Sequence, residues 1–532
     1  MEALAEFFFG LAAKASILLE AVNIDIDKLV DVLRYDPHQP LMFNTGLFML
    51  LFVAFMILFW IVKGVRVLKM ALVILFSLYF YYKSSGICCL ILVGVCVSDY
   101  VLGLLMEQAD KRGVLSAKKL IVGVNVVVNV GMLAYFKYFH LIIDTLSKFF
   151  TVSGGFESLL LPAGISFFTF RSISYIVDLY RGKLSACHSL FDYVFFLTFF
   201  PPLLAGPVVR AKDFLPQIKG NPIVTRAMTS EGVYLIMTGL VKKVVIADFI
   251  SGNFVDRVFD NPALYSGFEN MMATLGFTVQ LYCDFSGYSD MAIGIALLMG
   301  YRFLENFNAP FKAQNPTEFW HRWHISLSTW LRDYVYIPLG GNRCSRSRMY
   351  FNQFATMVIG GLWHGASWMY VIWGAIHGGL LVVHKFLRRV FPLTVSRTAV
   401  TETGEVVVMD SGLSSSPWIK GFNMIFTFLI ISVTFMFFRA PSLEDVGMMW
   451  HQILFDFHLS VAPQFVSGYL NIVLLMAGAY IIHITPSRLT DKPKMMFENA
   501  PVFVQAVILA IVILVVIQVR QSDIVPFIYL QY

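Results

Sequence analysis

The chain has 532 residues, of which 58% are hydrophobic and 14% are charged, whereas a soluble domain is nearer one quarter charged. This composition excludes an ordinary soluble protein and predicts an all-α, polytopic integral membrane protein that forms a single membrane domain over residues 1–532. The net charge of +6 gives no sign of a nucleic-acid partner, and the lipid bilayer is the first partner that we expect.

The N-terminus lacks the basic region of a signal peptide, because Glu2 and Glu6 stand there instead. We therefore expect it to be retained. Residues 1–40 are interpreted as an extension of amphipathic helices at the membrane interface.

Roughly eleven apolar segments are long enough to cross about 30 Å of hydrocarbon, with shorter re-entrant or interfacial pieces near 139–151 and 160–180. The predicted spans are 42–62, 70–82 with 86–106 as a tight pair, 119–138, 188–205, 230–250, 271–300, 352–372, 373–391, 419–438, 467–484 and 500–519.

Basic residues follow several of these spans. The positive-inside tendency predicts that the loops around 63–69, 111–119 and 343–348 are cytoplasmic. The last loop carries Arg343, Arg346 and Arg348. These arginines could attract the phosphates of a cytoplasmic cofactor, but an ordinary positive-inside loop is the favoured explanation.

Polar residues interrupt the apolar segment 281–303, "LYCDFSGYSDMAIGIALLMGYRF". Asp290 is a candidate for the wall of a substrate cavity, but polar side chains that bond one helix to another are the commoner explanation. For Lys242, Lys243 and Asp248, snorkelling or an internal ion pair is favoured over catalysis.

The stretch "NPTEFWHRWHISLSTWLRDYVYIPLGGNR" (315–343) places several charged residues in this apolar chain. Asn315, Pro316 and Glu318 form the start signal of a helix. From there an amphipathic helix is predicted, with tryptophans on one face and His321, His324, Ser328 and Arg332 on another. An interfacial anchor with wetted histidines is an equal alternative.

A metal site is not predicted. The HxxH pair lacks the glutamate of an HExxH protease motif, and the six cysteines contain no CxxC pair.

His364 stands in the uncharged run "IGGLWHGASWMYVIWGAIHGG" (359–379). An ionisable side chain inside a membrane helix is costly, so we expect a functional role for His364 near mid-bilayer. Gly360, Gly361 and Gly365 would let a backbone or a substrate come close. His377 has no second line of support and is interpreted as a structural histidine. The polar loop 393–418 is an insertion, and Thr403-Gly404 predicts a small hairpin within it.

Seven stretches resemble the membrane-bound O-acyltransferase (MBOAT) family, in its bacterial branch of alginate O-acetyltransferases and D-alanyl transfer proteins. They cover residues 40–440 in order. They are "LPAGISFFTFRSISYIVDLYRG", "FFPPLLAGPVVRAKDFLPQI", "GLVKKVVIADF", "YCDFSGYSDMAIGIALLMGYRF", the stretch 315–343, "GLWHGASWMYVIWGAIHG" and "FMFFRA". One departure is Arg171, where the branch usually has a neutral residue.

The resemblance implies an MBOAT fold around a central acyl-transfer cavity. It implies that His364 is the key intramembrane histidine and acts as general base, and that His324 is the second functional histidine, binding the acceptor or the developing oxyanion. Arg332 and Asp333 would hold the geometry of this wall of the cavity.

The implied activity is O-acetyl transfer from acetyl-CoA or another acyl thioester to an exported polysaccharide, in the bacterial inner membrane. The implied partner is an extracytoplasmic SGNH-hydrolase-like acetyltransferase, and no tightly bound cofactor is expected. Two alternatives stay open: transfer of D-alanine to teichoic acid, and a transporter of acyl or glycan cargo that does no chemistry. Transporters tend to have two related halves, and the sequence has no such symmetry.

Overall fold

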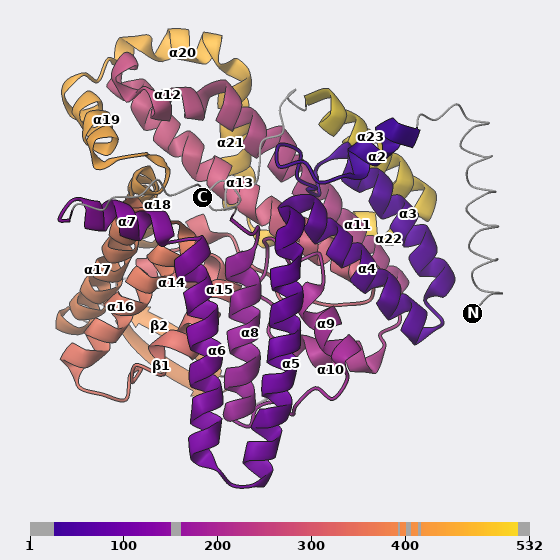
Figure 1. The fold of residues 1–532 in the computed structure, drawn as a ribbon. Coiled ribbons are helices and arrows are strands. Elements are labelled where there is room, and N and C mark those ends of the chain that lie inside the picture. The colour runs from indigo at the N-terminus through magenta and orange to yellow at the C-terminus, as the bar shows by residue number, and fades with distance from the viewer. Residues whose placement is uncertain (1–25, 151–160, 392–393, 401–405, 413–415, 520–532) are drawn as a thin grey trace.

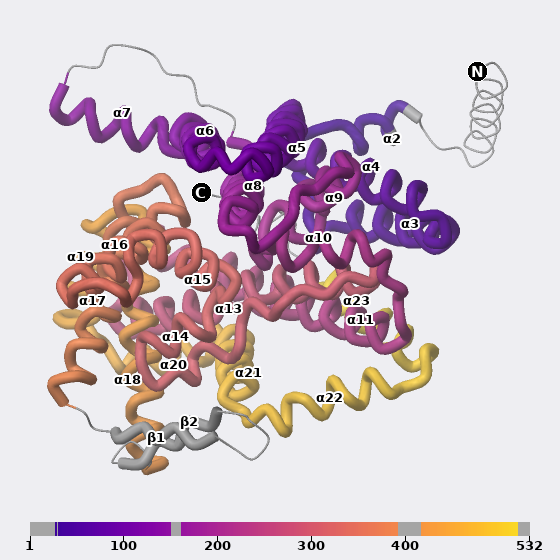
Figure 2. The backbone as a smooth tube through the Cα atoms, turned by 90° about the horizontal axis from the view of Figure 1, so that it is seen from below, coloured from indigo at the N-terminus to yellow at the C-terminus, as the bar shows by residue number. Residues whose placement is uncertain are grey.

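The computed structural model describes residues 26–150, 161–391, 394–400, 406–412 and 416–519. This part of the chain is helical apart from one hairpin (Figure 1 and, from below, Figure 2). The helices of the first half are α2 (Ile26–Leu33), α3 (Gly46–Val62), α4 (Arg66–Ser85), α5 (Cys89–Lys111), α6 (Leu115–Phe136), α7 (Phe139–Ser147), α8 (Ile165–Tyr180), α9 (Leu190–Thr198) and α10 (Ala211–Gly220).

The second half begins with α11 (Arg226–Leu240), which continues into the π-helical segments η2 (Val241–Asp248) and η3 (Ser251–Val255). The following elements are α12 (Asp256–Asp260), α13 (Gly267–Leu298), α14 (Pro316–Arg322), α15 (Ile325–Leu331), the π-helical η6 (Arg332–Tyr336), α16 (Arg346–His364), α17 (Trp368–Val390), β1 (Thr394–Val400), β2 (Val406–Gly412), α18 (Pro417–Arg439), α19 (Leu443–Phe455), α20 (Ala462–Gly468), α21 (Leu470–Ile484), α22 (Ser487–Asn499) and α23 (Val502–Val519). Single 3₁₀ turns are η1 (Gly86–Cys88), η4 (Pro262–Leu264), η5 (Pro310–Lys312) and η8 (Leu459–Val461).

Several of these helices can cross a membrane. By length and composition, five described segments qualify, or six if the bent pair at 459–484 is one span. They are Arg66–Lys111, Leu115–Phe136, Trp368–Val390, Pro417–Arg439 and Val502–Val519. The polytopic helical fold is therefore confirmed, whereas the predicted number of spans is not.

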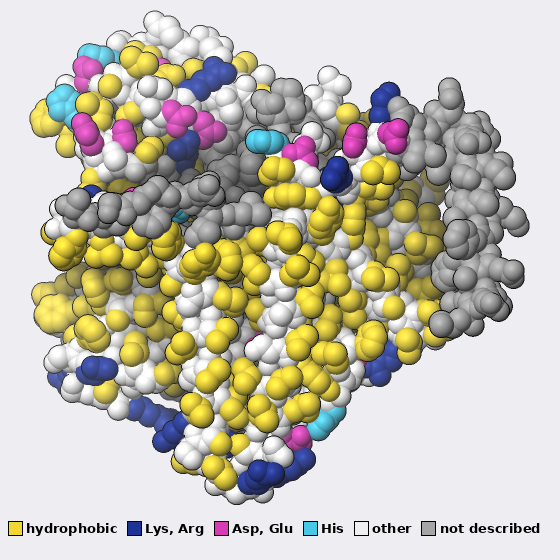
Figure 3. Space-filling view, in the orientation of Figure 1, with side chains coloured by type: hydrophobic (Ala, Val, Ile, Leu, Met, Phe, Trp, Pro, Cys, Tyr) yellow, Lys and Arg dark blue, Asp and Glu magenta, His cyan; other side chains and the backbone are white. Residues whose placement is uncertain are grey.

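Side-chain types are sorted along one direction of the molecule. Figure 3 shows a broad hydrophobic band, with Lys and Arg along its lower edge and also above it, and with Asp and Glu mostly near the top. The turn between α5 and α6 lies at the lowest point in Figure 1, and Lys111 and Lys118 flank it on the two helices. This arrangement agrees with the prediction that the basic loops share one side of the membrane.

The predicted hairpin in the polar loop is confirmed. β1 pairs with β2 in antiparallel register, from Thr394 opposite Gly412 to Val400 opposite Val406. The predicted turn at Thr403-Gly404 lies outside the described residues. Residues 1–25 of the predicted N-terminal extension also lie outside the described residues. The described helix of this extension is α2.

The predicted span 188–205 is wrong. Helix α9 ends at Thr198, and residues 199–210 continue as an irregular, fully buried segment. Irregular backbone at membrane depth is tolerated where protein surrounds it and supplies hydrogen bonds. Arg171, itself 1% exposed, donates to the carbonyl oxygens of Leu197 and Pro202. Arg171 thus holds this segment against α8.

Helix α13 runs through the core and is buried along most of its length. Its closest neighbour is α11, against which glycines meet in pairs. A Cβ atom added at Gly287 would lie 2.7 Å from the carbonyl oxygen of Gly239, and one at Gly239 would lie 2.6 Å from that of Gly287. Such backbone contact between membrane helices requires glycine. Lys243, from η2, forms ion pairs with Asp248 and Asp284 at 2.8 and 2.6 Å, as the internal ion-pair interpretation predicted.

Replacing Gly287 by Val should force α11 and α13 apart. We expect a loss of about 1–3 kcal/mol or more in the free energy of unfolding, because overpacking strains both backbones. The measurement is the apparent melting temperature of the purified protein in detergent. Gly478→Val on α21 is the matched control, since a Cβ there meets open space. Equal melting of both variants would show that the glycine contact does not hold the two helices together.

Candidate active site

His324 interrupts the helix predicted from residue 315. The start of that helix is confirmed, because the Asn315 side chain accepts a hydrogen bond from the Glu318 amide at 2.9 Å. The helix then ends at Arg322, and His324 has φ 43° and ψ 55° before α15 begins. The prediction of one continuous amphipathic helix is therefore wrong. A non-glycine residue in the left-handed region is strained, and such strain collects at functional sites.

A neighbouring segment holds the strained residue in place. The Asn308 amide donates to the carbonyl of Arg322 and the Ile325 amide donates to that of Asn306, both at 2.9 Å. The Asn306 side-chain oxygen also accepts from the Ser326 hydroxyl at 2.8 Å and from the Ser326 amide at 3.2 Å. Both sides of the break are thus bonded to residues 306–308.

Asn306 also fixes the protonation of the His324 ring. The Asn306 amide nitrogen donates to Ser289 Oγ at 3.1 Å, so its oxygen is the atom that faces His324 Nδ1, also at 3.1 Å. Nδ1 must therefore carry the proton, and Nε2 of the neutral ring keeps its lone pair. Among the described residues, this Nε2 has no hydrogen-bond partner. His324 presents a fully buried acceptor atom.

Aromatic rings surround His324. The Phe285 ring meets it edge-on with centroids 4.5 Å apart, and the Phe307 ring stacks at 6.4 Å. The indole of Trp363 lies 5.8 Å from the His324 ring and 5.0 Å from the ring of His364. The two predicted histidines therefore meet around one tryptophan, although forty positions separate them in the sequence.

His364 is the last residue of α16, not a mid-helix residue as the predicted span 352–372 requires. Its buried ring packs edge-on against Trp373 and Phe438, with centroids 5.0 and 5.2 Å apart.

The end of α16 is capped by α6. Lys137 Nζ donates to the carbonyl oxygens of Trp363 at 2.7 Å and His364 at 3.4 Å, and the Tyr138 hydroxyl donates to that of Leu362 at 2.8 Å. A cation at a helix C-terminus stabilises the helix dipole. These bonds fix the backbone on which His364 stands.

The glycines around His364 serve helix packing. A Cβ atom added at Gly361 would lie 2.3 Å from the carbonyl oxygen of Tyr370, and one at Gly365 would lie 2.1 Å from the Tyr370 ring. At Gly360 the nearest atom belongs to Leu331. Of the two predicted uses, close approach of a backbone is therefore confirmed for Gly361.

His377 is a structural histidine, as predicted. Its Nδ1 accepts from the Trp320 indole at 3.3 Å. Its Nε2 lies 3.0 Å from Thr434 Oγ1. Because that hydroxyl donates to the carbonyl of Ile431, Nε2–H must be the donor to it. Both ring nitrogens are used.

The other predicted residues are scattered. His321 is exposed, so its predicted place on the face of His324 is wrong. Ser328 bonds to the carbonyl of Trp323 at 3.3 Å. Asp290 pairs with Lys242 at 2.6 Å and thereby joins α13 to η2. Arg343, Arg346 and Arg348 are exposed.

Asp333 is the centre of an ion-pair cluster. Arg210 Nη1 and Arg332 Nε contact its two oxygens at 2.6 and 2.7 Å, and Arg181 donates to its backbone carbonyl at 3.0 Å. Burial raises the pKa of the Asp333 carboxyl, but the hydrogen bonds from Arg332 and Arg210 outweigh it and lower this pKa to about 2. The cluster ties η6 to α8 and to the buried segment before α10.

Sequence reasoning missed Asn306, Lys137 and Arg210. Asn306 lies between helices, eighteen positions before His324, where no periodicity marks it. Lys137 follows an apolar span and has the pattern of an interfacial anchor. Only the fold brings Asn306 and Lys137 to the two histidines.

Comparison with known proteins supplies the chemical context. The family model of the membrane-bound O-acyltransferase family matches residues 76–426. The chain is similar to "Probable alginate O-acetylase AlgI" of Pseudomonas aeruginosa, with 40% identity over 425 residues, 78% of this chain and 75% of the relative. It is 34% identical over 440 residues to a peptidoglycan O-acetyltransferase of Helicobacter pylori, covering 76% and 78%. A teichoic acid D-alanyltransferase of Streptococcus thermophilus is 32% identical over 303 residues, covering 54% and 70%.

Replacing Asn306 by Ala should destabilise the break at His324. The change leaves His324 Nδ1–H and the Ser326 amide without their acceptor, at a cost of about 1–3 kcal/mol per buried group. We expect a lower apparent melting temperature in detergent. Asn308→Ala, two positions away and exposed, is the control and should melt like the wild type. If Asn306→Ala also melts like the wild type, Asn306 does not hold the strained histidine.

Proposed function

Because the chain belongs to the membrane-bound O-acyltransferase family, we propose that it moves acetyl groups from acetyl-CoA in the cytoplasm to a polysaccharide outside the bacterial inner membrane. The observation that carries this proposal is the meeting of His324 and His364 around Trp363, inside a buried aromatic layer. Relatives that are O-acetylases of alginate or peptidoglycan support the acceptor class.

In the proposed reaction, His364 is the general base. An acceptor hydroxyl attacks the thioester carbonyl carbon while its proton passes to His364. The tetrahedral intermediate then collapses, the carbon–sulfur bond breaks, and the proton leaves with the thiolate. A positioned base of this kind contributes about 10²–10⁴-fold to the rate.

The geometry of His324 favours one of its two predicted roles. An oxyanion needs a hydrogen-bond donor, whereas the neutral ring offers an acceptor at Nε2 because Asn306 holds the proton at Nδ1. His324 therefore suits acceptor binding: Nε2 would accept a hydrogen bond from a hydroxyl group of the sugar and orient it toward the thioester.

The aromatic surroundings suit acyl transfer rather than hydrolysis. Phe285, Phe307, Trp363, Trp373 and Phe438 pack around the two imidazoles. Such a wall excludes bulk water, which would otherwise compete with the acceptor for the thioester. The fixed end of α16 holds the base in position without rearrangement.

On the cytoplasmic side, the exposed Arg343, Arg346 and Arg348 are candidates for attracting the phosphates of the donor. On the other side, an SGNH-hydrolase-like acetyltransferase would take part in delivery to the polysaccharide. The partner assignment rests on the resemblance of the sequence to the bacterial branch, and the donor assignment rests on the positive charge of this exposed loop.

Two alternatives differ in support. A D-alanyl donor is suggested by relatives that match about half of this chain, with lower identity. The O-acetyl relatives match about three quarters of it. A transporter without chemistry has no support from the family, whose members are acyltransferases.

The test is transfer of radiolabelled acetyl groups from acetyl-CoA in proteoliposomes that hold the wild type, His364→Ala, His324→Ala or His321→Ala. We expect His364→Ala to lower the rate by about 10²-fold or more. His324→Ala should lower it and raise the KM for the acceptor. The exposed His321 is the matched control and should leave the rate unchanged.

Size-exclusion profiles and melting temperatures establish that each variant is folded. A folded His364→Ala protein with wild-type activity would refute the role of His364. A wild type that is inert with acetyl-CoA but active with a D-alanyl thioester would overturn the choice of donor and leave the family assignment intact.

A further inference from the structure

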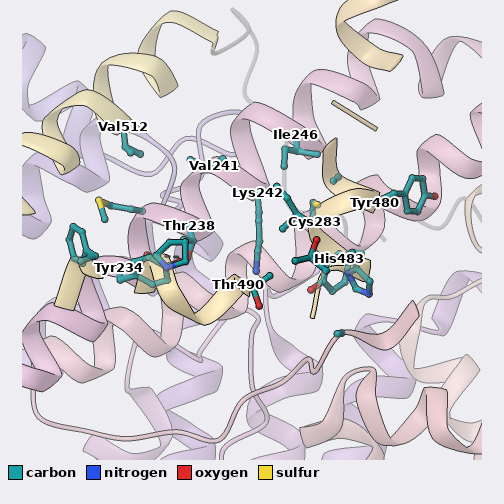
Figure 4. Close-up of a pocket in the computed structure, with 18 of the residues that line it drawn as sticks. Tyr234, Thr238, Val241, Lys242, Ile246, Cys283, Tyr480, His483, Thr490 and Val512 are labelled. Carbon is teal, nitrogen blue, oxygen red and sulfur yellow. Dashed lines mark hydrogen bonds between the residues drawn. The ribbon is translucent and has the colours of Figure 1, made fainter. Parts of the chain in front are cut away.

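A large pocket lies on a different side of α13 from the two histidines. Its volume is about 970 Å³, near the upper end of the range for ligand pockets. The walls come from α11, η2, α13, η5, α21, α22 and α23, and most of the side chains are apolar, such as Met237, Val279, Ile482, Phe497 and Val512. Figure 4 shows the side chain of Lys242 extending into this space.

An aromatic wall separates this pocket from His324. Tyr282 and Phe311 line the pocket, and their rings contact Phe307 or Trp323 behind them, at 5.9 and 6.3 Å. Phe307 in turn stacks on His324. The pocket is therefore a separate binding space, and its occupant would not touch the reacting groups.

Among the described basic side chains that line the pocket, Lys312 is the one whose ammonium group is not in a direct ion pair. Lys242 is neutralised by Asp290 at 2.6 Å. His483, also in the wall, accepts a hydrogen bond from the Phe311 amide. Lys312 Nζ donates to the carbonyl of Thr485 at 2.7 Å. The Asp491 carboxylate of α22 interacts with Lys312 electrostatically, but no carboxylate of the described residues forms a direct ion pair with it. An ammonium group has three donors, so Lys312 can bind an anion at the edge of an apolar space.

Helix α22 closes one side of the pocket. It contributes Thr490, Pro493, Met496 and Phe497 to the lining. It carries basic residues at 488, 492 and 494 and acidic residues at 491 and 498. Lys494 pairs with Glu231 of α11 at 3.0 Å. By the same charge rule that orients the basic loops, this amphipathic helix belongs to the cytoplasmic interface.

We propose that this pocket binds an anionic phospholipid of the cytoplasmic leaflet, with its acyl chains between α11, α21 and α23 and its phosphate on Lys312. Acyl chains fit the apolar walls, and a compact ammonium is a suitable phosphate ligand. Anionic lipids gather where basic groups face the inner leaflet, at about 1 kcal/mol per Lys or Arg. The bound lipid would pack α22 and α23 against the core.

The test is native mass spectrometry of the full chain after equilibration with mixed phosphatidylglycerol and phosphatidylethanolamine. Wild type should retain phosphatidylglycerol in preference. Lys312→Gln should lower that preference by about fivefold, whereas Lys492→Gln, on the exposed face of α22, should not. Ala479→Phe, which fills the pocket, should lower retention of both lipids.

Three results would overturn the proposal: a wild type that retains no lipid, equal retention of both lipids, or equal effects of Lys312→Gln and Lys492→Gln. Lipid retention is measured without any acyl transfer. A negative result therefore rejects the lipid site and leaves the proposed acyltransferase activity untouched. If Lys312→Gln does not fold, Ala479→Phe still decides whether the pocket holds lipid.

Discussion

The hydrogen bond between Asn306 and His324 is the constraint on which the candidate site depends. It holds a strained residue at a helix break, and it forces the proton of the imidazole onto Nδ1. A continuous helix would carry His324 on a regular face, whereas the break buries its ring completely. The bonds from residues 306–308 to both sides of the break supply the stabilisation that the strained backbone requires.

Buried polar side chains elsewhere in the membrane region also form specific hydrogen bonds. Two buried charged groups have specific partners: Asp99 accepts from Asn125, Ser172 and Tyr193, and Arg171 donates to the carbonyls of Leu197 and Pro202. The helices bearing the histidines are fixed in this way too, since Lys137 caps α16. Aromatic rings then fill the space around the two histidines, with Phe285, Phe307 and Trp363 in contact with the imidazoles.

Composition and motif spacing were enough to predict a helical membrane protein, the start of α14 and the hairpin at 394–412, whereas only the resemblance to the family joined His324 to His364 as functional residues. These predictions failed mainly where contacts between residues far apart in the sequence determine the local structure. The break at His324 is imposed by Asn306, which no local pattern marks. Helix α9 stops shortly before Pro201 and Pro202, which cannot continue a helix, and its continuation is bonded to Arg171. His364 ends its helix at the extended Gly365, and Lys137 bonds to the carbonyls of the last turn. An exposed residue such as His321 follows the helical spacing equally well, so periodicity alone could not exclude it.

A structure by electron cryomicroscopy with a thioether analogue of acetyl-CoA, which cannot transfer its acetyl group, tests the central claim most directly. The account predicts that the acetyl group lies against the His364 ring, within reach of an acceptor bound at His324 Nε2 and walled by Trp363. An acetyl group in the pocket between α11, α21 and α23, or at any place that touches neither histidine, would contradict it.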